Sequence, residues 1–142
     1  MILLPINASD EQILDLVRTW ATLLANEDYR AAFELTDHDP YYRWTPELIQ
    51  TVVQNYGSVE PLVDRAMFKV SPLDSAVGGP TPRQEVQRFE NPRKSGEERL
   101  PVLGNIWFDL PLNGEWSDLT ATFEIQESEE GVSLVLNDIH VF

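Results

Sequence analysis

The first part of the chain has the pattern of apolar and polar positions that an amphipathic helix requires. Ser9 and Gln12 have the spacing of a capping box, in which each side chain bonds the backbone of the other residue. The apolar positions that follow recur every three or four residues and are Ile13, Leu16, Val17, Trp20, Leu23 and Leu24. The pattern predicts a helix that begins after Ser9 and that Asn26 can close.

Two shorter helices are predicted next. Asp28 can cap a helix over about 29–35, and residues 37–42 then favour a loop, because Asp and Pro favour turns. Thr45 can cap a third helix with Pro46 at its first position, and Gly57 is its predicted end. The apolar stripe of this third helix is Leu48, Ile49, Val52 and Val53.

The remainder of the chain has a period of two, which is typical of strands. Strands are expected at about 65–70, 84–89 and 102–110. Between 119 and 126, apolar residues alternate with polar ones, which predicts a strand with one buried and one wet face. Asn113 and Gly114 favour a hairpin turn, because both tolerate positive φ.

A second hairpin and a bulge are predicted near the end of the chain. Residues 127–131 have the composition of a hairpin connection. In the last strand the apolar residues switch from even to odd positions, and they are Val132, Leu134, Leu136, Ile139 and Val141. A β-bulge near Asn137 and Asp138 would keep all five on the inward face.

Helices followed by strands predict an α+β domain, with about three N-terminal helices packed on a strongly curved antiparallel sheet. The order of these elements, with the run Asn26-Glu27-Asp28-Tyr29-Arg30-Ala31-Ala32-Phe33 and the ending Asn137-Asp138-Ile139-His140-Val141, resembles the nuclear-transport-factor-2-like superfamily, also called the cystatin-like cone fold. The resemblance covers nearly the whole chain and implies one domain over residues 1–142. Because this superfamily includes isomerases, dehydratases, ligand-binding proteins and transport adaptors, the resemblance selects no function.

Composition excludes several classes of function. The chain has 142 residues and no cysteine, so it has no disulfide, thiolate nucleophile or Cys-ligated zinc. Its 10 Lys and Arg against 24 Asp and Glu give a net charge of −14, which disfavours nucleic acid and anionic membranes and permits a cationic partner. The opening residues are too short for a signal peptide and no apolar run approaches a membrane span, so we expect a cytoplasmic protein.

The charge is unevenly distributed along the chain. Residues 1–82 hold 5 basic and 12 acidic side chains, residues 83–99 hold 5 and 4, and residues 100–142 hold 0 and 8. The strands after residue 100 therefore form an acidic sheet. Glu127, Glu129 and Glu130 lie on this part of the chain, either on a solvated face or on a docking surface for a basic protein.

We expect no metal and no cofactor. His38 and His140 are far apart, and Asp37-His38-Asp39 offers ligands too adjacent to converge on one ion. Asp138 and His140 are the candidates for acid–base catalysis, because residues two apart on a strand share a face. The alternative is that the bulge turns both of them toward solvent or a partner chain.

Aromatic residues offer two further candidate sites. Trp20, Phe33, Tyr56 and Trp107 belong to the core or line a cone mouth that binds a flat apolar ligand. Tyr41, Tyr42 and Trp44 lie in a predicted loop, where they form a protein contact patch or seal the open end of the core.

These observations predict a homodimer that acts as a non-enzymatic binding or interaction module. Its partner is a basic protein, as for the small acidic immunity-type domains that neutralise cationic nuclease toxins. The alternative is a pocket for a small apolar ligand, or an isomerase-like or dehydratase-like enzyme that uses Asp138 or His140.

Overall fold

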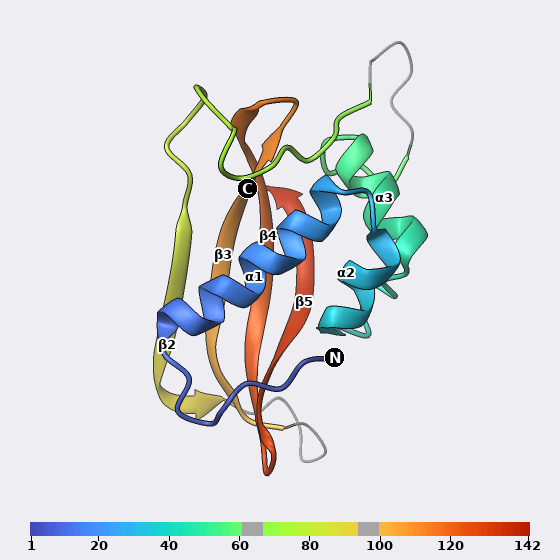
Figure 1. Ribbon diagram of the computed structural model, residues 1–142. Helices are drawn as coiled ribbons and strands as arrows, with labels where there is room; N and C mark the ends of the chain where they lie inside the picture. The colour runs from blue at the N-terminus through green and yellow to red at the C-terminus, as the bar shows by residue number, and fades with distance from the viewer. Residues whose placement is uncertain (61–66, 94–99) are drawn as a thin grey trace.

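Three helices and five strands make up the described part of the chain, which comprises residues 1–60, 67–93 and 100–142 of a computed structural model (Figure 1). The elements are, in order, α1 (Asp10–Ala25), α2 (Tyr29–Leu35), β1 (Asp37–His38), α3 (Pro46–Gln54), β2 (Gln84–Arg93), β3 (Val102–Leu112), β4 (Glu115–Ser128) and β5 (Gly131–Val141). The predicted α+β class is confirmed, because the three helices precede the four long strands.

The predicted helix starts are confirmed by their caps. The Ser9 hydroxyl accepts from the Gln12 amide at 3.1 Å, and the Gln12 side chain accepts from the Ser9 amide at 2.8 Å, which completes the capping box. Asp28 caps α2 by accepting from the Ala31 amide at 3.2 Å. Thr45 caps α3 through the Leu48 amide at 3.0 Å.

The end of α3 differs from the prediction. The helix ends at Gln54, three residues before Gly57, and Asn55 is its C-cap. Tyr56 and Gly57 both have positive φ, of 53° and 91°, and the Gly57 amide donates to the Val52 carbonyl at 2.8 Å. This hydrogen bond is typical of a Schellman motif, whose glycine-like position is filled here by tyrosine.

One open sheet contains all five strands in the order β1-β5-β4-β3-β2. The four long strands are antiparallel neighbours, as predicted. β1 instead pairs in parallel with β5, through Asp37 with Val135 and His38 with Leu136, so the sheet is mixed. The sequence predicted only a loop here, because two residues are too few to show a period and their pairing depends on the presence of β5.

The predicted bulge in β5 is confirmed at Asn137. Thr122 of β4 pairs with Asp138, whereas its neighbour Phe123 pairs with Leu136, so Asn137 is the extra residue. Leu136 and Ile139 are both buried as a result. Asp138 therefore lies on the side of the sheet that carries Thr122, away from the helices.

The hairpins and most strands also lie where the sequence pattern predicts them. Asn113 and Gly114 have φ of 51° and 88° at the β3–β4 turn. Ser128 pairs with Gly131 at the β4–β5 turn. The strand expected at 65–70 falls partly outside the described residues, and its described part contains no strand, only a bridge from Val70 to Leu112.

The core lies between the helices and one face of the sheet, and α1 crosses that face diagonally (Figure 1). Trp20 of α1 is fully buried and meets Phe123 of β4 edge-on, with ring centres 5.0 Å apart. Burying such large apolar rings is the main stabilising contribution at this contact. Within the described part of the chain, no helix combines the length and apolar character that crossing a membrane requires.

Candidate functional site

The sheet face opposite the helices carries the candidate site. Cross-strand pairing aligns Trp107 of β3, Thr122 of β4 and Asp138 of β5 in one row. The next row continues through Glu124 and Val135 to Asp37 of β1. The alternation that buries one face of β4 therefore presents a polar and aromatic face on the other side.

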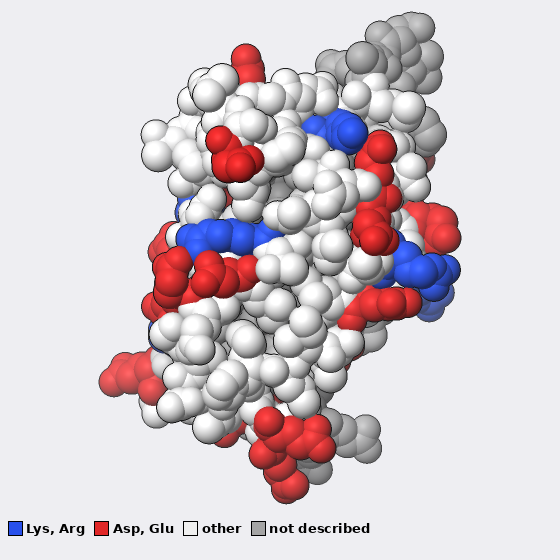
Figure 2. Space-filling model, in the orientation of Figure 1, with Lys and Arg blue, Asp and Glu red and all other residues white. Residues whose placement is uncertain are grey.

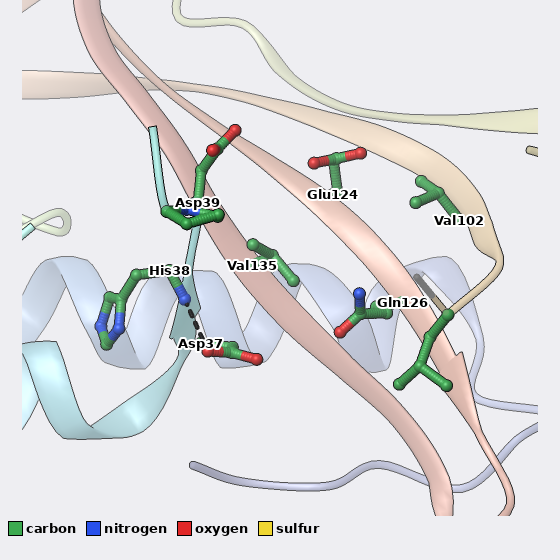
Figure 3. A pocket seen from close by; sticks show the side chains of 9 residues that line it. Asp37, His38, Asp39, Val102, Glu124, Gln126 and Val135 are labelled. Carbon is green, nitrogen blue, oxygen red and sulfur yellow. Dashed lines mark hydrogen bonds between the residues drawn. The ribbon is translucent and has the colours of Figure 1, made fainter. Parts of the chain in front are cut away.

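The first cavity on this face, which we call the acidic cavity, has a volume of about 260 Å³. Its lining residues are Asp37, His38, Asp39, Pro40, Leu100, Val102, Glu124, Gln126 and Val135. The carboxylates of Asp39 and Glu124 extend toward the same side of this cavity (Figure 3). The short parallel strand β1 is what brings Asp37 and Asp39 beside β5 and β4.

His38 is turned away from these carboxylates. Its ring stacks on Phe33 of α2, with ring centres 3.9 Å apart, and its Nε2 lies 2.7 Å from the Phe33 carbonyl oxygen. Figure 3 shows this ring pointing to the opposite side of β1 from Asp39. Among the described residues, no group of three or more His, Asp or Glu side chains is arranged to hold a metal ion.

Three aspartates of this face have one carboxylate oxygen fixed by a local backbone amide. Asp37 accepts from the His38 amide at 2.9 Å, Asp39 from the Tyr41 amide at 2.9 Å, and Asp138 from the Ile139 amide at 2.8 Å. Within the described ranges, no Lys or Arg forms an ion pair with any of the three. Their charges are therefore oriented by the backbone and not neutralised by any Lys or Arg in the described part of the chain.

The second cavity, the aromatic cavity, has a volume of about 290 Å³ and adjoins the first at Asp39. It is lined by Asp39, Tyr42, Asn105, Trp107, Thr122, Phe123, Asn137, Asp138 and Phe142. The Trp107 and Phe142 rings are 4.9 Å apart. The guanidinium carbon of Arg83 lies 4.6 Å from the Trp107 ring centre, so a cation of the chain itself already contacts this aromatic group.

The third cavity, the apolar cavity, has a volume of about 360 Å³ and lies between α3 and the end of β5. Its lining residues are Tyr41, Tyr42, Trp44, Leu48, Val52, Gly57, Val59, Asp138, Ile139 and His140. It adjoins the aromatic cavity at Tyr42 and Asp138.

Tyr42 and Asp138 form the wall between these two cavities. The Tyr42 hydroxyl donates to Asp138 Oδ2 at 3.4 Å, a long hydrogen bond. Burial, with a smaller effect from the Asp138 charge, raises the pKa of the Tyr42 phenol. Tyr42 is therefore a neutral donor at physiological pH.

A fourth cavity of about 240 Å³, the hairpin cavity, lies beside the β4–β5 turn and adjoins the acidic cavity at Leu100. It is lined by Leu100, Pro101, Glu127, Ser128 and Glu129. We call the four adjoining cavities the acidic band. Six carboxylates line the band, and its described lining contains no Lys or Arg; the six are Asp37, Asp39, Glu124, Glu127, Glu129 and Asp138.

The structure separates the four aromatic residues that the sequence placed together at a cone mouth. Trp20 is in the core, Phe33 stacks on His38, and Trp107 is on the opposite face of the sheet from Trp20. Tyr56 packs on Phe68 and donates to Asp118. Of the four, only Trp107 lines one of the cavities described above.

The loop aromatics divide between the two roles that the sequence left open. Trp44 is buried, with 6% exposure, and its Nε1 donates to the Asn137 carbonyl at 3.0 Å, so it seals the end of the core. Tyr41 is 83% exposed and contacts Tyr42. These two tyrosines belong to the surface of the band.

The remaining candidates lie along the same band. Asp138 is half-buried and His140 is exposed, both on the face away from the core, as the bulge predicted. Glu127 and Glu129 line the hairpin cavity, and Glu130 is exposed in the turn beside it.

Sequence reasoning missed Asp37, Asp39, Glu124 and Phe142 as parts of one surface. Glu124 could be assigned to the wet face of its strand, because the alternation shows it. No local pattern brings residues 37–39 next to it, since that requires the parallel pairing of β1 with β5. The contact between Phe142 and Trp107 likewise depends on tertiary structure.

No catalytic or ligand-binding assignment reaches this chain from a relative. Comparison with protein-family models, with curated proteins and with solved structures finds no match.

Proposed function

We propose that this protein is a non-enzymatic interaction module that binds a basic partner protein through the acidic band. The observation that carries the proposal is the lining of four adjoining cavities by six carboxylates and no described Lys or Arg. A surface whose described charged lining is acidic, and which also carries aromatic groups, favours a partner segment that presents cations.

The distribution of the remaining charge supports this choice of face. Every ion pair among the described residues involves α1, α2 or the turn that joins them, and the cations concerned are Arg18, Arg30, Lys69 and Arg88. Figure 2 shows basic groups lying beside acidic ones on this helix face. Because these cations on the helix face are paired with carboxylates, the net charge of −14 comes more from the rest of the surface than from this face.

Long-range electrostatics would help such a partner to bind. A surface with a strong potential of one sign raises the association rate of an oppositely charged protein, and salt weakens the effect. Acidic atoms also gather at the tip of the β4–β5 hairpin, the turn that carries Glu129 and Glu130 (Figure 2). This hairpin extends the band toward an approaching partner.

Kinship with the nuclear-transport-factor-2-like superfamily is part of the proposal. Three helices on a curved mixed sheet are compatible with a cone-like fold, and the element order is the one that the resemblance implies. A homodimer through the sheet and a cytoplasmic location stay predictions. A second copy bound at the acidic band would bring like charges together, so we assign this face to a different, basic protein.

A small-molecule function is the second candidate, because Asp138 and His140 both line the apolar cavity. A catalytic pair would need a free carboxylate or a carboxylate that orients the imidazole. Asp138 instead bonds the Ile139 amide and Tyr42, and His140 is exposed beside Phe142. The binding role therefore has the stronger geometric support.

The proposal is tested with a short arginine- and lysine-rich peptide as the probe, in titrations at low and high salt. The variant carries Asp37→Asn, Asp39→Asn and Asp138→Asn, because each asparagine keeps the acceptor that bonds the local amide. We expect binding at low salt to weaken at least about tenfold and to lose most of its salt dependence.

The matched control removes the same charge from exposed positions outside the band, with Glu47→Gln, Asp74→Asn and Glu90→Gln. It is expected to bind the probe almost as well as the unmodified chain. If both triple variants lose binding equally, the effect comes from net charge and the proposed site is wrong. Absence of binding to the unmodified chain at low salt would overturn the function itself.

A further inference from the structure

The wall between the aromatic and apolar cavities joins two sites of different chemistry. Tyr42 and Asp138 line both cavities. On one side of this wall lie Asp39, Trp107 and Phe142, which combine a carboxylate with two aromatic rings. The other side is formed mainly by apolar side chains of α3, the loop after it and β5, which are Leu48, Val52, Val59 and Ile139.

The aromatic cavity has the composition that suits a guanidinium group. A guanidinium is planar and weakly hydrated, stacks on aromatic rings and bonds carboxylates through a fixed set of N–H donors. Asp39 and Asp138 supply carboxylates from two different segments, and neither is paired with a described cation. A lysine ammonium would gain less, because it is more strongly hydrated and cannot stack as a plane.

A further observation at this cavity concerns Trp107 as a partner for a guanidinium group. The Arg83 guanidinium stacks over Trp107, which shows that this ring accepts such a group. An arginine side chain carries five N–H donors, so it can bond the carboxylates of Asp39 and Asp138 together while its plane lies against an aromatic ring.

The apolar cavity offers an anchor position directly beside it. Its volume of about 360 Å³ is the largest of the four, and the exposed edge of Val59 lies at its rim. Interfaces obtain most of their affinity from a few large side chains buried in such pockets. An apolar side chain here would lie next to the charged group across the wall formed by Tyr42 and Asp138.

We propose that these two cavities form a composite subsite for an arginine and a neighbouring large apolar side chain of the basic partner. The arginine occupies the aromatic cavity, and the apolar residue occupies the apolar cavity. This inference rests on the proposed function, because it assigns the part of the acidic band that selects the partner's sequence. The acidic and hairpin cavities then contribute attraction for further cations without selecting among them.

The test uses four labelled peptides of equal length that differ at two central positions, measured by fluorescence anisotropy with the full chain. The central pairs are Arg-Leu, Lys-Leu, citrulline-Leu and Arg-Ser. We expect Arg-Leu to bind at least about fivefold more tightly than each of the other three. Citrulline keeps the shape of arginine without its charge, so it separates stacking from ion pairing.

Two variants examine the two halves of the subsite separately. Val59→Trp fills the apolar cavity from a position that is 67% exposed. We expect it to weaken binding of the Arg-Leu peptide and to leave the affinity for the Arg-Ser peptide unchanged. Val77→Trp is its control, because Val77 is 73% exposed and lines none of the four cavities. Asp138→Asn should reduce the preference for arginine over citrulline, whereas Asp74→Asn should not.

The outcomes distinguish this inference from the proposed function. Equal binding of the Arg-Leu and Lys-Leu peptides, with binding still lost in the triple aspartate variant, overturns the arginine subsite and leaves the acidic band in place. Equal effects of Val59→Trp on the Arg-Leu and Arg-Ser peptides overturn the apolar anchor. If none of the peptides binds at low salt, the proposed function fails together with the subsite. Unfolding midpoints of each variant exclude loss of the fold as the cause.

Discussion

Phe123 and Trp107 are aromatic residues on adjacent strands that face opposite sides of the sheet. Phe123 is fully buried against Trp20, whereas Trp107 lies between Arg83 and Phe142 on the band. Residue type alone gives both a large apolar area, so the sequence could assign either to the core. The register of β3 and β4 decides between them.

The difference predicts unequal costs of truncation. Phe123→Ala should lower the free energy of unfolding by about 3–5 kcal/mol, because it leaves a cavity in a packed core. Trp107→Ala should lower the free energy of unfolding clearly less, since the ring is only half-buried. The same variant should weaken binding of the Arg-Leu peptide. Urea unfolding and peptide titration of both variants measure this, and an equal loss of stability would contradict the assignment of Trp107 to the surface.

Tyr29 provides a residue-scale prediction about pH. Burial raises the pKa of its phenol above the ordinary value of 10.0, and the Glu27 charge raises it further. The unfolded chain therefore loses this proton at a lower pH than the folded chain. Its contribution to stability is present below about pH 10 and is lost as the pH rises through the folded pKa.

Replacing the Tyr29 phenol should remove its part of the stability that the folded chain loses at alkaline pH. Tyr29→Phe should show a smaller fall in unfolding free energy between neutral pH and about pH 11 than the unmodified chain. Tyr41→Phe is the control, because Tyr41 is 83% exposed. A fall for Tyr29→Phe as steep as that of the control would show that Tyr29 does not contribute.

At the scale of elements, the bulge in β5 determines which side chains form the band. Because Asn137 is the extra residue, Leu136 and Ile139 both face the core while Asp138 faces outward. The Asn137 carbonyl also accepts from Trp44, so the bulge holds the loop that carries Tyr41 and Tyr42. One irregular residue therefore connects the core to the surface.

Deleting the bulge residue Asn137 and deleting Val135 before it should have different effects. Without Asn137 the strand becomes regular, and Leu136 and Ile139 keep their inward positions, so we expect a folded chain with a loss of about 1–3 kcal/mol from the Trp44 hydrogen bond. Without Val135, Leu136 turns outward and Asn137 inward, which adds about 1.5–3 kcal/mol for the exposed leucine. Circular dichroism and urea unfolding compare the two deletions, and equal losses would be inconsistent with the proposed register.

Another element-scale feature is β1, whose two residues bring Asp37 beside Val135. Its residues form no period that a sequence pattern can show. The helices, by contrast, follow from caps that act within three residues, and the hairpin at Asn113 and Gly114 follows from their φ preferences. Local interactions were predictable, and this short non-local pairing was not.

At the scale of the whole molecule, surface charge acts on a partner over a longer distance than any other interaction discussed above. The β4–β5 hairpin projects from the sheet and carries acidic side chains at its tip (Figures 1 and 2). Charges in such a position act on the approach of a partner more than on the bound complex.

Reversing the hairpin charges should therefore slow association. The variant Glu127→Lys, Glu129→Lys and Glu130→Lys should reduce the association rate of the basic peptide at low salt by about tenfold, with a smaller change in the dissociation rate. Stopped-flow measurements at low and high salt test this. Unchanged association at low salt would remove the hairpin from the proposed docking surface.

The sequence by itself determined the helices with their caps, the long strands, the bulge and the acidic character of the last third, because each depends on residues close together in the chain. It also predicted that Asp138 and His140 face away from the core. Only the tertiary structure decided that Trp107 and Trp20 lie on opposite faces, and that β1 carries Asp37 and Asp39 to the carboxylate of Glu124. The reason is that the band is assembled from segments about a hundred residues apart in the chain. These segments come into contact only when β1 pairs with β5 in the folded sheet.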